Sequence, residues 1–278
     1  MSNRDHCFGR VPRSGASLLL VCLSSGSLAS LAHAENSSDI AKQAQNPIAS
    51  LISVPFQNST TFGVGEHGST ADALLVEPVI PVTLSPDWNL VTRTIVPLLD
   101  EPSLAPGLGD VGGLGDIQLS LYLSPARATH GIIWGLGPSF SFATASDRSL
   151  GTGKDSAGLS TAVLTIRGHW LVGTLITDVA SVGGQEDRKS VHQFLIQPFI
   201  NYNFAKGWYL NSSPIVIADW HASSSNKWTV PMGGGGGKIL RLGKQAVNCY
   251  VQAFDNVVHP HAAGNWTLRV QVQLLFPR

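Results

Sequence analysis

The chain has 278 residues, with 18 basic and 18 acidic side chains; 43% of its residues are hydrophobic and only 13% are charged. The balanced charge excludes the strongly basic surface that nucleic-acid-binding proteins present. After the N-terminal region no stretch of 18 consecutive residues is apolar, so the sequence predicts no membrane-spanning helix.

The first 34 residues have the pattern of a cleaved export signal. Three arginines between positions 4 and 13 form a basic region, an apolar stretch follows over residues 16–31, and Ala32-His33-Ala34 supplies a small-x-small cleavage site. Val21 precedes Cys22, where a lipoprotein signal needs a small residue, so we expect no lipid anchor. We therefore expect a signal peptide at 1–34, a short periplasmic N-terminal segment at 35–49 and one membrane domain at 50–278.

Loss of the signal leaves a slightly acidic chain with one cysteine. The signal carries three basic residues and one acidic residue, so the mature chain retains 15 basic and 17 acidic side chains. Cys249 is then the single cysteine of an exported protein, which excludes an internal disulfide as a source of stability. Closure of a sheet into a barrel is one alternative source.

The mature chain alternates apolar and polar residues with a period of two. In the last segment one face carries Trp266, Leu268, Val270, Val272, Leu274 and Phe276, and the other carries Thr267, Arg269, Gln271 and Gln273. Segments 117–123, 134–142 and 193–204 alternate in the same way. Runs of about 9–11 residues are long enough for tilted strands to cross a membrane, whereas soluble strands more often have about five or six residues.

A sheet in lipid must close on itself, because hydrocarbon offers no partner to unpaired backbone groups. The pattern therefore predicts an all-β fold, a transmembrane antiparallel β-barrel of about 12 strands, with 10 or 14 as alternatives. The strands are expected to begin near Ser53, Leu74, Asn89, Asp116, Ile132, Leu159, Leu171, Val191, Trp208, Trp228, Ala246 and Trp266. Pro138 and Pro198 fall inside two alternating runs, and we expect a bulge or local break at each because proline cannot donate to the ladder.

The connections between these strands alternate in length. We expect longer ones at 63–70, 100–112, 144–158, 181–190, 221–226 and 258–265, and short turns at 85–87, 167–169, 205–207 and 243–245. The connection at 124–131 should be short on this scheme and is not. Outer-membrane barrels have long external loops and short periplasmic turns, so the alternation places both termini in the periplasm. All seven tryptophans fall near predicted strand ends, which is typical of aromatic girdles at the two interfaces.

Several stretches are similar to a family of bacterial outer-membrane proteins. They are Val-Pro-Phe-Gln-Asn at 54–58, Trp-Asn-Leu-Val-Thr-Arg-Thr-Ile-Val-Pro at 88–97, Gly-Leu-Gly-Asp-Ile-Gln at 113–118, the five-glycine stretch 228–248, and segments 252–258 and 266–277. The family is named after the meta-pathway of phenol degradation, and its members are often labelled transporter or neuromedin U. The resemblance covers the mature chain from residue 46 onward and implies an outer-membrane barrel with a transport role, without identifying a substrate. Cys249 and Asp255 depart from the family pattern.

Two glycine-rich strings match cofactor motifs only in part. Gly107-Leu-Gly-Asp-Val-Gly112 fits a dinucleotide-binding string, but a period-two segment follows where that site needs a helix. Lys238 follows glycines 233–237 as in a phosphate-binding loop, but Met232 replaces the first required glycine and Ile239 the magnesium-binding hydroxyl. We expect no cofactor. The first string fits a flexible external loop, and the five glycines fit a sharp bend or the close approach of another backbone or a plug.

The histidines of the mature chain do not form a catalytic pattern. They are His67, His130, His169, His192, His221, His259 and His261, and nearly all lie in predicted loops. No serine motif accompanies them, so a lipid-modifying barrel enzyme is the least favoured function. His259 and His261 could share a metal, but no further ligand cluster supports such a site. We therefore expect no catalytic residue and no metal.

The polar strand faces are expected to line the lumen. The candidates are Arg93, Gln118, Ser120, Arg167, Gln193, Gln197, Asn201, Asn203, Arg269, Gln271 and Gln273, with Asp178 and Asp219 as acidic counterparts. A polar, largely uncharged lining favours passive passage of small solutes, including aromatic or hydrophobic ones. The main alternative is a sealed structural or adhesive barrel that presents its loops outside. Outer-membrane lipid and a small solute are the expected partners, and the sequence leaves the cargo and the oligomeric state open.

Overall fold

The computed structural model describes residues 40–103 and 109–276 of the chain. The expected signal peptide, residues 35–39, part of the 100–112 connection and Gly107 of the dinucleotide-type string lie outside these ranges. No helix among the described residues is long and apolar enough to cross a membrane.

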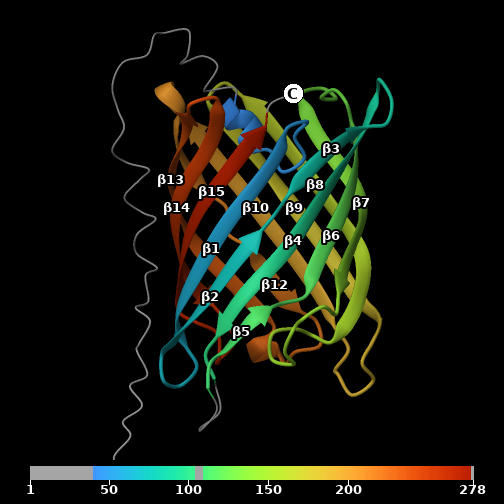
Figure 1. The fold of residues 1–278 in the computed structure, drawn as a ribbon, viewed down its shortest axis with the longest axis vertical. Helices are drawn as coiled ribbons and strands as arrows, with labels where there is room; N and C mark the ends of the chain where they lie inside the picture. Colours follow the sequence, from blue (N-terminus) through green and yellow to red (C-terminus); the bar gives the residue numbers. More distant parts are fainter. Residues whose placement is uncertain (1–39, 104–108, 277–278) are drawn as a thin grey trace, which may run out of the picture. The chain divides into compact units, whose positions relative to one another are not determined.

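One antiparallel sheet makes up the described fold. Its segments are β1 (Ile52–Val64), β2 (Ser69–Val76), β3 (Val79–Thr83), β4 (Trp88–Glu101), β5 (Val111–Leu114), β6 (Ile117–Pro125), β7 (Ile132–Phe142), β8 (Lys154–Arg167), β9 (Trp170–Gly184), β10 (His192–Asn203), β11 (Trp208–Ser212), β12 (Val216–Asp219), β13 (Trp228–Leu242), β14 (Gln245–Val258) and β15 (Trp266–Phe276). β1 pairs with β15 from Ile52↔Phe276 to Phe62↔Trp266, so the first and last strands close the sheet into the barrel of Figure 1.

The fifteen segments form twelve barrel strands. β2 and β3 both pair with β1 and β4, and β11 and β12 both pair with β10 and β13, so each couple is one strand with a break. β5 and β6 share β4 in the same way. The prediction of a closed, twelve-stranded antiparallel barrel is therefore confirmed.

Both predicted proline breaks are confirmed. The β6–β7 ladder stops at Ser120↔Ser139 and resumes at Leu123↔Leu136, so the gap contains Pro138. Pro198 lies opposite the break between β11 and β12, because β11 pairs with β10 from residue 200 onward and β12 pairs with residues 193–196. A proline has no N–H for the ladder, and the sheet tolerates it where the neighbouring strand is interrupted.

The connections differ between the two ends of the barrel. One end, which also carries both ends of the described chain, has connections at 84–87, 126–131, 168–169, 204–207 and 243–244. The other end has connections at 65–68, 102–110, 143–153, 185–191, 220–227 and 259–265. We call these the short-turn end and the loop end. The expectation of a long connection at 63–70 was wrong, because Gly65 and Gly68 take positive φ values and close a four-residue turn.

The two faces of the sheet differ as the alternation predicts. On β15 the side chains of Arg269, Gln271 and Gln273 are buried inside the barrel, whereas Trp266 and Phe276 are exposed. Large apolar side chains are exposed on the outer face around the barrel; examples are Ile80, Leu159, Leu210 and Val251. A soluble monomer rarely exposes so much continuous apolar surface, so this wall suits a lipid environment.

The tryptophans form two groups. Trp88, Trp134, Trp170 and Trp208 lie at or near the first residues of strands that begin at the short-turn end. Trp220, Trp228 and Trp266 lie beside the connections of the loop end. The predicted placement at strand ends is confirmed, and the two groups mark the levels at which amphipathic rings would meet a membrane–water interface.

Glycines 233–237 do not bend β13 sharply. They pair with residues 250–254 of β14 in unbroken register. A Cβ at Gly235 would lie 1.8 Å from the backbone oxygen of Val251, and a Cβ at Gly237 would lie 2.4 Å from the ring of Tyr209. The alternative expectation, close approach of other groups, therefore describes this segment. Because glycine has no side chain, the segment leaves room for the buried ring of Tyr209.

Residues 40–49 pack inside the short-turn end of the barrel. A helical turn at 40–44 leads into an irregular stretch, visible in blue at that end in Figure 1. Ile40, Ala41 and Ala49 share an apolar cluster with Ile239 and Leu275 of the wall. Ile48 joins a second cluster formed by interior side chains of the opposite wall, such as Val91 and Tyr122. We call residues 40–49 the N-terminal plug.

Candidate functional site

Two cavities lie one after the other along the interior of the described barrel. The one next to the N-terminal plug has a volume of about 140 Å³ and is lined chiefly by amide and hydroxyl side chains. We call it the polar cavity. Its lining includes Gln45 and Asn46 of the plug, and from the wall Ser53, Gln57, Gln197, Asn201, Asn211, Ser213, Asn248, Tyr250, Gln271 and Gln273.

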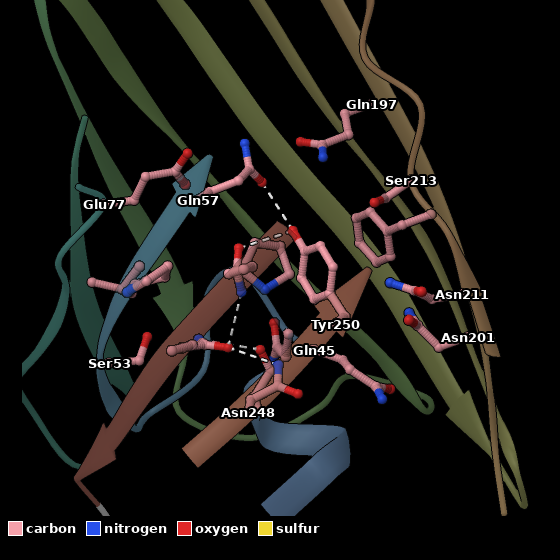
Figure 2. A pocket seen from close by; sticks show the side chains of 18 of the residues that line it. Gln45, Ser53, Gln57, Glu77, Gln197, Asn201, Asn211, Ser213, Asn248 and Tyr250 are labelled. Atoms are coloured by element: carbon pink, nitrogen blue, oxygen red, sulfur yellow. Dashed lines mark hydrogen bonds between the residues drawn. The ribbon is translucent and has the colours of Figure 1, made fainter. Parts of the chain in front are cut away.

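Hydrogen bonds fix the side chains on one wall of the polar cavity. The hydroxyl of Tyr250 lies 2.9 Å from the side-chain oxygens of both Gln57 and Gln271. The amide nitrogen of Asn248 donates to Gln273 at 2.9 Å, and its oxygen accepts from the hydroxyl of Tyr209 at 2.6 Å. Figure 2 shows the hydrogen bond between Tyr250 and Gln57 along this wall. Such a network holds neutral donors and acceptors in place around the space.

The second cavity lies towards the loop end and is larger, with a volume of about 530 Å³. Apolar atoms contribute the larger part of its surface, from Leu75, Ile95, Pro97, Leu99, Leu150, Leu175, Val179, Leu195, Ile215 and Ile217 among others. We call it the apolar cavity. A cavity of about 150 Å³ is enough to bind benzene, so this one has room for a small apolar molecule.

The two cavities share four lining residues: Glu77, Arg93, Leu175 and Gln197. Glu77 and Arg93 form a salt bridge of 2.6 Å, and their side chains are 9% and 18% exposed. Arg93 lies near the middle of β4, and Glu77 occupies the break between β2 and β3. This ion pair therefore stands at the junction of the cavities, halfway along the interior.

The N-terminal plug closes the polar cavity from the short-turn end. The Gln45 and Asn203 side-chain amides pair with each other, with N···O distances of 2.8 and 3.1 Å. Asn203 also donates to the backbone oxygen of His169. The plug is thus fixed by one reciprocal amide pair and by the apolar contacts of Ile40, Ala41, Ile48 and Ala49.

The connection 143–153 covers part of the apolar cavity at the loop end. Leu150 of this connection is buried and lines the cavity. The Asp116 carboxylate accepts hydrogen bonds from the backbone nitrogens of Ala145 and Thr152, and from the hydroxyl of Thr152. The guanidinium of Arg188 donates to the backbone oxygens of residues 148, 151 and 152. Both charged groups hold the connection folded inward.

The structure brings most predicted lumen residues to these cavities. Arg93 and Gln197 line both; Gln118, Ser120 and Gln193 line the apolar cavity; Asn201, Gln271 and Gln273 line the polar cavity. Asn203 instead holds the plug. Arg269 is buried beside the polar cavity, on its loop-end side. There it donates to the backbone oxygen of Ser213 at 2.9 Å and lies over the ring of Phe254.

Three expected residues lie elsewhere: Arg167, Asp178 and Asp219, the last of which is exposed at the end of β12. Arg167 is exposed at the end of β8, and its neighbour Ile166, which has the opposite parity, packs against the interior cluster. Asp178 lies 3.2 Å from His192, with both side chains exposed, and the inward positions of β9 are those of Leu175 and Thr177. The sequence assignment failed at Arg167 because both faces of β8 carry apolar residues, Ala162 and Leu164 inward and Leu159 and Val163 outward, so alternation does not mark its inward face.

Glu77, Tyr209 and Tyr250 are site residues that the sequence did not identify. Glu77 immediately precedes Pro78, and a residue before proline is held in an extended conformation outside the helical region. That signal marks the strand break but not the direction of the carboxylate. Tyr209 and Tyr250 alternate correctly with their neighbours, yet tyrosine is equally common at lipid interfaces, so parity alone did not separate the two roles.

The histidine rings engage in no serine–histidine pair among the described residues. His169, His221 and His259 contact backbone oxygens, and His192 contacts Asp178. Within residues 40–103 and 109–276 no group of three or more His, Cys, Asp or Glu side chains could hold a metal ion.

The closed antiparallel barrel with an apolar wall, two girdles and a polar interior defines the class of outer-membrane β-barrels. Comparison with solved structures agrees. An outer-membrane channel from Pseudomonas putida F1 is similar with a TM-score of 0.60 and 15% identity, over 81% of this chain and 94% of that one. The NanC porin is similar with a TM-score of 0.53 and 8% identity, over 82% of this chain and all of that one. The sequence matches no protein-family model and no curated protein.

Proposed function

We propose that this protein is an outer-membrane channel that gives passive passage to small solutes, including apolar and aromatic ones. The observation that carries the proposal is the succession of two cavities along the closed interior, one largely apolar and one lined by neutral polar groups. A solute that leaves water and enters the apolar cavity gains hydrophobic contacts there. The polar cavity then offers donors and acceptors on the way to the other side.

The signal-like N-terminus and the lengths of the connections support a placement in the membrane. The signal-like N-terminus supports export to the outer membrane, and the short turns support a periplasmic position for both termini. The stretches that resemble the phenol meta-pathway family, and the similarity to an outer-membrane channel, support the same role.

The test is single-channel recording of the mature chain, residues 35–278, in planar bilayers. Discrete ohmic steps are expected, together with uptake of neutral aromatic alcohols by proteoliposomes. Folded protein that gives neither current nor uptake, both as the mature chain and with the plug weakened by Ile48→Ala, would refute the proposal.

A sealed barrel that presents its loops is the second candidate. The N-terminal plug favours it, because the plug closes the interior at one end. This function predicts that deletion of external connections alone abolishes a cell-surface phenotype. A lipid-modifying enzyme would instead turn over phospholipid or lipid A and lose that activity when one histidine is replaced.

A further inference from the structure

We propose that the Glu77–Arg93 ion pair sets the charge selectivity of the lumen. By cancelling each other, the two groups keep the junction of the two cavities neutral, so that neither small anions nor small cations are favoured at that point. The inference rests on the proposed passive passage and goes beyond it by assigning the selectivity to two residues.

The position of the pair is the first argument. Among the described residues only four line both cavities, and Glu77 and Arg93 are two of them. Of the described residues that line the polar cavity, these two are the charged ones; the other polar side chains are amides and hydroxyls. A solute that moves from one cavity to the other therefore passes this pair. Further charges along the interior are Arg269, buried beside the polar cavity, and Glu101 and Asp116, which line the apolar cavity.

The backbone holds the pair in place. At the break between β2 and β3, the nitrogen of Glu77 donates to the oxygen of Pro55 at 2.9 Å. The oxygen of Pro78 accepts from the nitrogen of Thr94, the residue after Arg93, at 3.1 Å. The break turns the carboxylate inward beside the guanidinium, 2.6 Å away. A charge held in one place acts more strongly on a passing ion than a mobile charge does, because its field does not average out over side-chain rotamers.

The energetic consequence of removing one partner is an uncompensated charge in a confined space. Low-dielectric walls concentrate the field of such a charge along the passage. Glu77→Gln leaves Arg93 unpaired and should attract anions, and Arg93→Gln leaves Glu77 unpaired and should attract cations. A permeating ion that passes a few ångströms from the unpaired charge in water-like surroundings interacts with it strongly enough to change its permeability. We expect this interaction to shift the permeability ratio by about fivefold.

The experiment measures reversal potentials of the mature chain in a potassium chloride gradient at neutral pH. We expect the chloride-to-potassium permeability ratio to rise about fivefold in Glu77→Gln and to fall about fivefold in Arg93→Gln. The double variant Glu77→Gln/Arg93→Gln is neutral again and should return to the ratio of the unchanged chain. It also removes both charges of the pair together, so neither Glu77 nor Arg93 leaves a buried partner charge behind, and the test stays valid where a single variant folds poorly.

Asp72→Asn is the matched control. Asp72 lies on β2, in the same strand of the barrel as Glu77, but its carboxylate accepts from the hydroxyl of Thr60 on the outer face. This variant removes the same charge without changing the lumen, and its permeability ratio should not shift. Equal shifts in Asp72→Asn and Glu77→Gln would overturn the inference.

Two negative results are distinguishable. Ohmic currents with the same permeability ratio in the unchanged chain and in both single variants would place the ion path away from the pair, which overturns this inference and leaves passive passage standing. Silence from every folded chain would overturn passive passage, and this inference with it.

Discussion

Release of the N-terminal plug should open the channel. Gln45→Ala removes one partner of the reciprocal amide pair with Asn203, whose two N···O distances are 2.8 and 3.1 Å. Each such hydrogen bond contributes about 0.5–1.5 kcal/mol net, so the plugged state should lose about 1–3 kcal/mol. Since 1.4 kcal/mol is tenfold in an equilibrium constant, the ratio of open to plugged barrels should rise by about 5- to 150-fold.

Ile48→Ala tests the apolar half of the same contact. Ile48 is buried against Val79, Val91 and Tyr122. Truncation of a buried isoleucine to alanine costs about 2–5 kcal/mol, so this variant should open the barrel at least as much as Gln45→Ala. The barrel wall itself keeps its strand pairing in both variants, and its thermal unfolding should change little.

The assay is the open probability in planar bilayer recordings. Gln43→Ala is the matched control, because Gln43 is the same residue type two positions earlier in the plug and its side chain is exposed. Gln43→Ala should behave as the unchanged chain. The reasoning is refuted if Gln45→Ala and Gln43→Ala give the same open probability, or if Ile48→Ala closes the channel further.

Three further predictions concern the wall, the inward loop and the glycine run. Val272→Arg should lower the free energy of unfolding by about 2–4 kcal/mol if the residue lies at mid-bilayer, whereas Gln271→Arg should fold nearly normally and change the conductance; equal damage in urea titrations would contradict the assignment of faces. Arg188→Ala should release the connection 143–153, which is measured as faster hydrogen exchange in that segment, while the free energy of unfolding changes by less than about 0.5 kcal/mol. Arg127→Ala at the short-turn end is the control and should leave the exchange of 143–153 unchanged. Gly237→Ala should destabilise the barrel by about 1–3 kcal/mol through overpacking against Tyr209, and Gly109→Ala, whose Cβ would meet nothing within 4 Å, should not; similar melting temperatures for the two would disprove the close-approach argument.

The strand pattern of this protein was readable because a membrane imposes a strict rule on sequence. In β15 every second residue must be apolar, since one face meets hydrocarbon and the other does not. The alternation from Trp266 to Phe276 therefore predicted both the strand and its inward residues, Arg269, Gln271 and Gln273, all of which are buried in the barrel. Prolines 138 and 198 marked ladder breaks for an equally local reason, the missing N–H.

The candidate site was only partly predictable. Parity gives a direction to each side chain but not its partner, so the sequence supplied Arg93 and offered Asp178 and Asp219 as acidic counterparts without identifying Glu77. The partner is Glu77, which lies sixteen positions earlier in the chain, on an adjacent strand. Parity also gives no direction where both faces of a strand carry apolar residues, as in β8, and an error of one residue then reverses the face assigned to Arg167.

By itself, the sequence determined the class of fold, a strand number of about twelve with ten or fourteen still open, the lipid-facing wall and the level of the tryptophan girdles. These properties depend on the alternation of apolar and polar residues and on where it stops, and both can be read from the residues of each strand separately. The tertiary structure alone decided the division of the interior into an apolar and a polar cavity, the Glu77–Arg93 junction, and the return of residues 40–49 into the barrel. Those features join residues far apart in sequence, such as Gln45 and Asn203, and they exist only because closure of the sheet brings distant strands around one shared interior.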